Sequence, residues 1–158
     1  MITFDLGPVR FSYRTVAVCL HDGYVFAEQA DHEDFWSLPG GRVAVSETAE
    51  EAVRREMREE LGLEPRIERL LWVVENLFTH EGRAGHEIGL YYLVSFDAEA
   101  EVYDRSRNLR CLDVPELRLA WLPVVSLEET RLVPRFLRTH LRALPATVAH
   151  IVNRDDGT

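Results

Sequence analysis

Three glutamates near the middle of the chain have the residue type and spacing needed to hold a cation. Glu56, Glu59 and Glu60 stand at positions i, i+3 and i+4, so a helix would place all three carboxylates on one face. Carboxylates grouped in this way repel one another unless a cation lies between them. Carboxylate oxygens suit Mg²⁺ or Mn²⁺, and the sequence has no His or Cys cluster at zinc spacing. The triplet therefore predicts a magnesium or manganese site.

Neighbouring residues extend this candidate site. Pro39, Gly40 and Gly41 form a tight turn before the acidic segment, and glycine allows a backbone carbonyl to approach a cation closely. Arg55 can bind a carboxylate through two hydrogen bonds, with Glu47 as a candidate partner, and we assign it an orienting role. A site of this kind suits the hydrolysis of a phosphoanhydride. The alternative is a solvated Glu/Arg helix without a ligand, which is the commoner use of such a segment.

The complete spacing of this segment favours the cation site. It reads G-x5-E-x7-R-E-U-x-E-E-x-G-U, where U is apolar, over residues 41–63. The matching residues are Gly41, Glu47, Arg55, Glu56, Met57, Glu59, Glu60, Gly62 and Leu63. This pattern resembles the Nudix box, the signature of the MutT-like Nudix hydrolase family. The preceding sequence WSLPGG resembles the usual lead-in to that box.

The resemblance implies a fold, a reaction and a cofactor. The implied fold is an α/β/α sandwich with a mixed β-sheet. The implied enzyme is a pyrophosphohydrolase that uses Mg²⁺ or Mn²⁺ to hydrolyse a nucleoside diphosphate linked to another moiety. Its mechanism would be in-line attack of a metal-activated water on one phosphorus, while the other phosphate leaves.

The resemblance also assigns expected roles by position. Glu59 and Glu60 resemble the metal-binding pair of the family. Glu56 resembles the residue that acts as a further metal ligand or as the general base. The Gly41 carbonyl resembles an additional ligand.

Supporting and alternative residues complete the expected site. Arg55 with Glu47 resembles the supporting pair of the box, and Gly62 is expected to end the helix. Some family members take the base from a later loop, so Glu87 and Glu116 are further candidates for the general base and for metal binding. The alternatives are a strand-edge charge for Glu87 and a surface residue for Glu116.

The substrate is less specified than the reaction. Phe35 and Phe78 are candidates to stack on a nucleobase, and His80 and Arg83, in an expected loop over residues 79–85, are candidates to contact a phosphate or base. Core aromatics and solvated loop residues are the alternatives. The extra markers of ADP-ribose, dinucleoside polyphosphate, NADH and coenzyme A hydrolases are missing. The expected partner is therefore a nucleotide-type small molecule of unspecified identity.

Capping signals predict where the acidic segment becomes a helix. Thr48 and Glu51 form a capping-box pattern, and Gly62 is a natural residue just past a helix end. The helix is expected over residues 47–61, with one apolar face and one carboxylate face.

Apolar runs predict the strands that must hold this helix in place. Strands are expected at residues 15–20, 24–28, 66–78, 87–96, 120–124 and 147–152. A C-terminal helix is expected from the helical spacing of Val133, Phe136, Leu137, Leu141 and Leu144. We expect helices on both faces of a mixed sheet, with residues 1–153 as one Nudix hydrolase domain and residues 154–158 as a disordered tail.

Composition narrows the classes of function. The 158 residues carry a formal net charge of −9, which argues against binding an extended nucleic acid. A catalytically weak nucleotide-sensing module and a messenger-RNA 5′-end pyrophosphohydrolase remain as alternatives. No signal peptide or apolar run of membrane-spanning length is visible, so the cytoplasm is the expected location. The family pattern suggests a homodimer.

Overall fold

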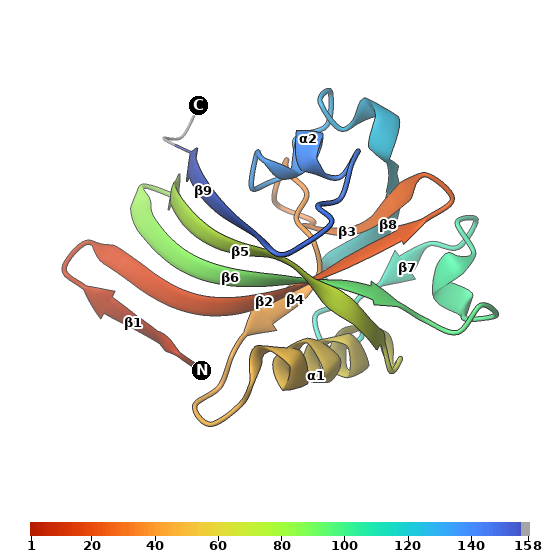
Figure 1. The fold of residues 1–158 in the computed structure, drawn as a ribbon, viewed down its shortest axis with the longest axis horizontal. Coiled ribbons are helices and arrows are strands. Elements are labelled where there is room, and N and C mark those ends of the chain that lie inside the picture. The colour runs from red at the N-terminus through yellow and green to blue at the C-terminus, as the bar shows by residue number, and fades with distance from the viewer. Residues whose placement is uncertain (156–158) are drawn as a thin grey trace.

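One large mixed sheet forms the centre of the fold (Figure 1). The computed structural model describes residues 1–155 of the chain. The elements in chain order are β1 (Thr3–Leu6), β2 (Val9–His21), β3 (Tyr24–Ala30), β4 (Gly40–Arg42), α1 (Ala49–Leu61), β5 (Arg66–His80), β6 (Arg83–Ser95), the 3-10 turn η1 (Glu101–Tyr103), β7 (Leu109–Arg110), β8 (Leu117–Pro123), the 3-10 turn η2 (Val124–Ser126), α2 (Leu137–His140) and β9 (Ala149–Asp155). The strand order is β7-β8-β3-β2-β6-β5-β9, with β1 and β4 both paired to β2.

Strand β2 lies at the middle of this sheet and is covered on both faces. It runs parallel to β6 and antiparallel to β3 and β4. Val16 and Val18 belong to one core, whereas Ala17 and Cys19 belong to the other, as the alternation of side chains along a strand requires. The prediction of a strand buried on both faces is confirmed here.

Each face of the sheet has its own core, and a different helix covers each of the two faces (Figure 1). Val53 and Met57 of α1 pack with Phe26 of β3 on one side. Leu137 of α2 packs with Trp72 of β5 on the other side. The predicted α/β/α arrangement with a mixed sheet is therefore confirmed. No helix in the described part of the chain is long and apolar enough to cross a membrane.

Helix α1 begins and ends at the residues that its caps specify. The Thr48 hydroxyl accepts a hydrogen bond from the Glu51 N–H (3.2 Å), and the Glu51 carboxylate accepts one from the Thr48 N–H (2.8 Å). The first helical residue is Ala49, two residues after the predicted start. Gly62 has a φ of 69° and donates its N–H to the Arg58 carbonyl, which closes the helix where the sequence predicts.

The prediction of a loop over residues 79–85 is wrong. Strand β5 continues to His80 and β6 begins at Arg83, so only Glu81 and Gly82 form the turn. Both turn residues have positive φ, at 50° and 75°, which matches the backbone of a two-residue hairpin. The polar residues on either side of the turn are paired with each other across the hairpin. Their polar composition is typical of a loop, although they belong to two strands.

The C-terminal segment is helical over a shorter stretch than its spacing predicts. Phe136, Leu137 and Leu141 are buried as expected, but only Leu137–His140 forms an α-helix. Arg138 donates its N–H to the carbonyl three residues earlier, so part of the segment has 3-10 geometry.

The last strand extends beyond the boundary that the sequence suggests. β9 includes Arg154 and Asp155, where the sequence suggests the start of a tail. The other residues of that predicted tail, 156–158, lie outside the described part of the chain.

Candidate active site

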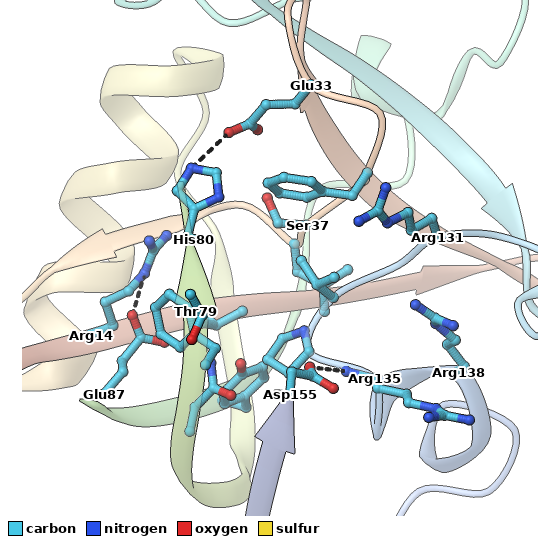
Figure 2. A pocket seen from close by; sticks show the side chains of 18 residues that line it. Arg14, Glu33, Ser37, Thr79, His80, Glu87, Arg131, Arg135, Arg138 and Asp155 are labelled. Carbon is cyan, nitrogen blue, oxygen red and sulfur yellow. Dashed lines mark hydrogen bonds and ion pairs between the residues drawn. The ribbon is translucent and has the colours of Figure 1, made fainter. Parts of the chain in front are cut away.

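A pocket of about 680 Å³ lies between the sheet and the C-terminal segment (Figure 2). Its apolar lining includes Val16, Phe35, Leu38, Phe78 and Tyr91. Its polar lining includes Arg14, Glu33, Ser37, His80, Glu87, Arg131, Arg135, Arg138 and Asp155. Figure 2 shows Arg131, Arg135 and Arg138 on one side of the pocket and Arg14 with Glu87 on the other. A ligand that combines apolar surface with negative charge fits this lining.

Three of the four residues predicted to bind substrate line this pocket. They are Phe35, Phe78 and His80. The Phe78 ring lies directly over Gly85 of the paired strand. A Cβ atom on that glycine would be only 2.4 Å from the ring, so the contact requires glycine. Arg83 is not among the lining residues, and its guanidinium pairs with Asp5 of β1 at 2.5 Å.

Arg14 connects the pocket to the turn that precedes the acidic helix. It lines the pocket, and its Nη2 atom donates a hydrogen bond to the Gly40 carbonyl at 3.1 Å. Its Nε atom lies 3.9 Å from a carboxylate oxygen of Glu87. Although burial lowers the pKa of Arg14, the charges of Glu87 and Glu28 raise it above its usual value. Arg14 is therefore a permanent cation at the end of the pocket nearest β4.

The two glycines of β4 permit close contacts that no side chain would allow. A Cβ atom on Gly40 would lie 2.3 Å from the Thr15 carbonyl oxygen, and Gly40 has a φ of 152°. A Cβ atom on Gly41 would lie 2.0 Å from the carboxylate carbon of Glu56. The Glu56 carboxylate therefore packs directly against the Gly41 backbone. This contact brings together two of the residues that the sequence predicts as metal ligands.

Arg55 holds several of the predicted carboxylates in place. Its Nε donates to Glu47 at 2.8 Å, and its Nη1 donates to Glu56 at 2.6 Å and to Glu59 at 3.2 Å. Its Nη2 donates to the Arg42 carbonyl of β4. The guanidinium thus ties α1 to the preceding loop and lies beside the face on which the ligands are predicted.

The acidic triplet divides between the interior and the surface. Glu56 and Glu60 are only 9% and 5% exposed, whereas the Glu59 side chain is 46% exposed. The buried pair shares a helical face with Val53 and Met57, at spacings of three, four and seven residues. The prediction that separate faces carry the carboxylates and the apolar residues is therefore wrong, because Glu56 and Glu60 lie on the side that packs on the sheet.

The electrostatic environment of the buried pair fits a cation. Burial, followed by the charges of Glu28 and Glu56, raises the pKa of Glu60. Burial also raises the pKa of Glu56, against the lowering effect of Arg55. The Oε2 atom of Glu60 is buried and has no hydrogen-bond partner among the described residues. Buried carboxylate oxygens without donors are favourable positions for Mg²⁺ or Mn²⁺.

The predicted carboxylate ligands do not converge on a single point. Within residues 1–155, no group of three Asp, Glu, His or Cys side chains converges on one point as a metal site. Glu56 and Glu59 are both hydrogen-bonded to Arg55. Each of them has a second oxygen that is not bonded to Arg55, so a cation can bind there while Arg55 holds the carboxylate in position.

Glu28 of β3 is a buried carboxylate that the sequence reasoning missed. It is 7% exposed and accepts a hydrogen bond from the Ser37 hydroxyl at 3.3 Å. Its charge acts on both Arg14 and Glu60. The sequence YVFAE could have indicated this position. Glu28 stands two residues after the buried Phe26, so the two side chains lie on the same face of a strand.

The two later glutamates have different positions. Glu87 lines the pocket beside Arg14. Glu116 is exposed and is not among the pocket-lining residues. Asp113, in the loop before β8, is the residue of that region whose charge acts on Glu60. The sequence of this loop does not show by itself which of its acidic residues, Asp113 or Glu116, lies near Glu60.

Comparisons with known proteins match this chain to one family. A family model described as the NUDIX domain matches residues 12–143. An ADP-ribose pyrophosphatase from Methanocaldococcus jannaschii is 29% identical over 104 residues, covering 65% of this chain and 57% of that protein. An RNA pyrophosphohydrolase from Haemophilus influenzae is 36% identical over 76 residues, covering 46% of this chain and 36% of that protein. The matches thus span 57% and 36% of the lengths of these relatives.

A solved structure gives the same result for the fold. The crystal structure of a MutT NUDIX hydrolase from Burkholderia pseudomallei is 28% identical in sequence, with a TM-score of 0.54. The match covers 73% of this chain and 84% of that one.

Proposed function

The chain belongs to the Nudix family, and on that premise we propose that it is a divalent-cation-dependent hydrolase of a nucleoside diphosphate linked to another moiety. The observation that carries this proposal is the chain of contacts that links the pocket, through Arg14 and the two glycines of β4, to Glu56. Arg14 lines the pocket and binds Gly40, while the next residue, Gly41, packs against Glu56. A phosphoanhydride that extends from the pocket past Arg14 would approach the carboxylates of α1.

The proposed cation site uses residues from α1 and β4. Glu56, Glu59 and Glu60 would hold Mg²⁺ or Mn²⁺ through carboxylate oxygens, together with the Gly41 carbonyl. When bound, the ion would neutralise phosphate charge and lower the pKa of a coordinated water. Arg55 keeps Glu56 close to β4 and holds Glu59 on the same side of the helix.

The remaining roles belong to the pocket. Arg14 is positioned to bind a phosphate oxygen, because its guanidinium is fixed by Gly40 and Glu87 at the pocket wall. Phe35 and Phe78 offer ring surfaces to a nucleobase. Glu56 and Glu87 are the candidates for the general base, since both are carboxylates near Arg14.

The names of the relatives support the reaction class. An ADP-ribose pyrophosphatase and an RNA pyrophosphohydrolase are both named for cleavage of a pyrophosphate bond. Their names give different substrates, so they do not identify the moiety linked to the nucleoside diphosphate. The homodimer and the cytoplasmic location stay predictions.

A substrate panel tests this proposal. Nucleoside triphosphates, nucleotide sugars, ADP-ribose, dinucleoside polyphosphates and 5′-triphosphorylated or capped RNA are incubated with the protein and Mg²⁺ or Mn²⁺. Release of phosphate or nucleoside monophosphate from at least one of them, abolished by a chelator, is expected. Binding without release from any of them would instead favour a nucleotide-sensing module.

A further inference from the structure

We propose that Glu28 of β3 is an additional ligand of the cation, so that the ion-binding set extends from α1 and β4 onto β3. This inference rests on the proposed function, because it assumes that Glu56 and Glu60 bind a divalent cation.

The position of Glu28 in β3 directs its side chain to the face that α1 covers. Side chains alternate along a strand, so Glu28 shares a face with Phe26. Phe26 packs with Val53 and Met57 of α1. The same helix face carries Glu56 and Glu60 at neighbouring positions. A strand and a helix that are distant in sequence thus bring their buried carboxylates to one interface.

The backbone of Glu28 is held firmly. Its N–H donates to the Ser37 carbonyl at 2.8 Å, and its carbonyl accepts the Ser37 N–H at 2.9 Å. It is also paired with Leu119 of β8 on the other side. A ligand on a paired strand is positioned before the ion arrives, which lowers the cost of ordering the site.

The side chain of Glu28 lacks the partners that a purely structural glutamate needs. One oxygen accepts a hydrogen bond from the Ser37 hydroxyl. The other oxygen, Oε2, is buried and has no hydrogen-bond partner in the described part of the chain, as is also true of one oxygen of Glu60. A buried carboxylate costs free energy unless it is paired. Two such oxygens at one interface are better explained by a cation that both of them bind.

The nearby arginines do not remove this need for a cation. Arg55 makes its carboxylate hydrogen bonds to Glu47, Glu56 and Glu59. Arg14 makes its hydrogen bond to Gly40 and lies nearest to Glu87. Neither guanidinium is hydrogen-bonded to the free oxygen of Glu28.

Titration of the full chain with Mn²⁺ alone tests the inference without using activity. Free Mn²⁺ is measured by electron paramagnetic resonance for the wild type, Glu28→Gln, Glu60→Gln and Glu68→Gln. Glu68 is the matched control, because it is an exposed β5 glutamate that accepts a hydrogen bond from the Ser95 hydroxyl. Glu28→Gln is expected to weaken Mn²⁺ binding by about tenfold or more, and Glu68→Gln to leave it unchanged. The melting temperature of metal-free Glu28→Gln is expected to equal or exceed that of the wild type, since an unpaired buried charge is removed.

Three results would overturn the inference, and they are distinguishable. Unchanged Mn²⁺ affinity in Glu28→Gln, with loss of affinity in Glu60→Gln, would exclude Glu28 alone and leave the proposed function standing. Unchanged affinity in Glu60→Gln would remove both proposals. A lowered melting temperature of metal-free Glu28→Gln would assign Glu28 to stabilising the fold rather than to binding the ion.

Discussion

Arg55 binds Glu47 through two hydrogen bonds, from Nε to Oε1 at 2.8 Å and from Nη2 to Oε2 at 3.1 Å. This paired geometry requires the planar fork of a guanidinium. The pair connects the middle of α1 to the loop before it, since Glu47 also accepts the Ala44 N–H. Because Arg55 contacts Glu56 and Glu59 as well, the position of two predicted ligands depends on this one side chain.

The first prediction concerns this fork. Replacing Arg55 by lysine keeps the charge but removes the two-point contact. Cation affinity is expected to fall by roughly 10- to 100-fold, the range found for partners that orient metal ligands. Isothermal titration with Mn²⁺ measures the change. Arg58→Lys is the matched control on the same helix, because Arg58 pairs with the exposed Glu64. Equal affinities for the two variants would contradict the orienting role.

The second prediction concerns the contact between Gly41 and Glu56. A methyl group on Gly41 would overlap the Glu56 carboxylate, so Gly41→Ala is expected to lower the free energy of unfolding by about 1–3 kcal/mol. The same change should cost much less in a Glu56→Ala background, where the overlapping group is absent. Urea unfolding of the four proteins in this double-mutant cycle measures the difference. An equal cost in both backgrounds would mean that the two residues do not touch.

The third prediction concerns the pH dependence of the metal-free protein. Burial, together with neighbouring negative charge in the case of Glu60, raises the pKa of the Glu28 and Glu60 carboxyl groups. A carboxyl with a raised pKa holds its proton more tightly when folded, so stability falls as the pH rises above the ordinary glutamate pKa of about 4.3. The melting temperature in chelator is therefore expected to decrease from pH 5 towards alkaline pH. Glu60→Gln should flatten this decrease, and an equally steep decrease in that variant would contradict the assignment.

The fourth prediction concerns the pocket. Phe35 lines it and meets the His80 ring edge-on, with ring centroids 5.7 Å apart. If Phe35 stacks on a nucleobase, Phe35→Ala should raise KM by roughly 2- to 10-fold with little change in kcat. Steady-state kinetics with the best substrate of the panel measures this effect. Phe4→Ala is the control, because Phe4 is exposed on β1 and stacks on Phe11. An unchanged KM in Phe35→Ala would remove the stacking role.

Features that depend on nearby residues could be predicted from the sequence. The Thr48 cap involves a residue three positions away, and the Gly62 end requires only one residue with positive φ. The pairing of Arg55 with Glu47 likewise needs only helical spacing and a short loop. These interactions form within a single stretch of chain, so their signals are visible there.

Features that depend on strand pairing could not be predicted in the same way. Glu28 lies near enough to Glu56 and Glu60 for their charges to interact only because β3 and α1 pack in one core. The polar residues around Glu81 and Gly82 indicate a loop until β5 and β6 pair across them. Asp155 follows an expected strand end, yet it lines the pocket. In each case the deciding partner is distant in sequence.

Turnover by the Glu59→Gln/Glu60→Gln double variant tests the central claim most directly. The substrate is the one that the wild type hydrolyses fastest with Mg²⁺ or Mn²⁺, and thermal unfolding shows that the variant is folded. The account predicts that the folded variant loses metal-dependent hydrolysis, because two of the carboxylates that would hold the ion are gone. Hydrolysis at the wild-type rate by the folded double variant would contradict it.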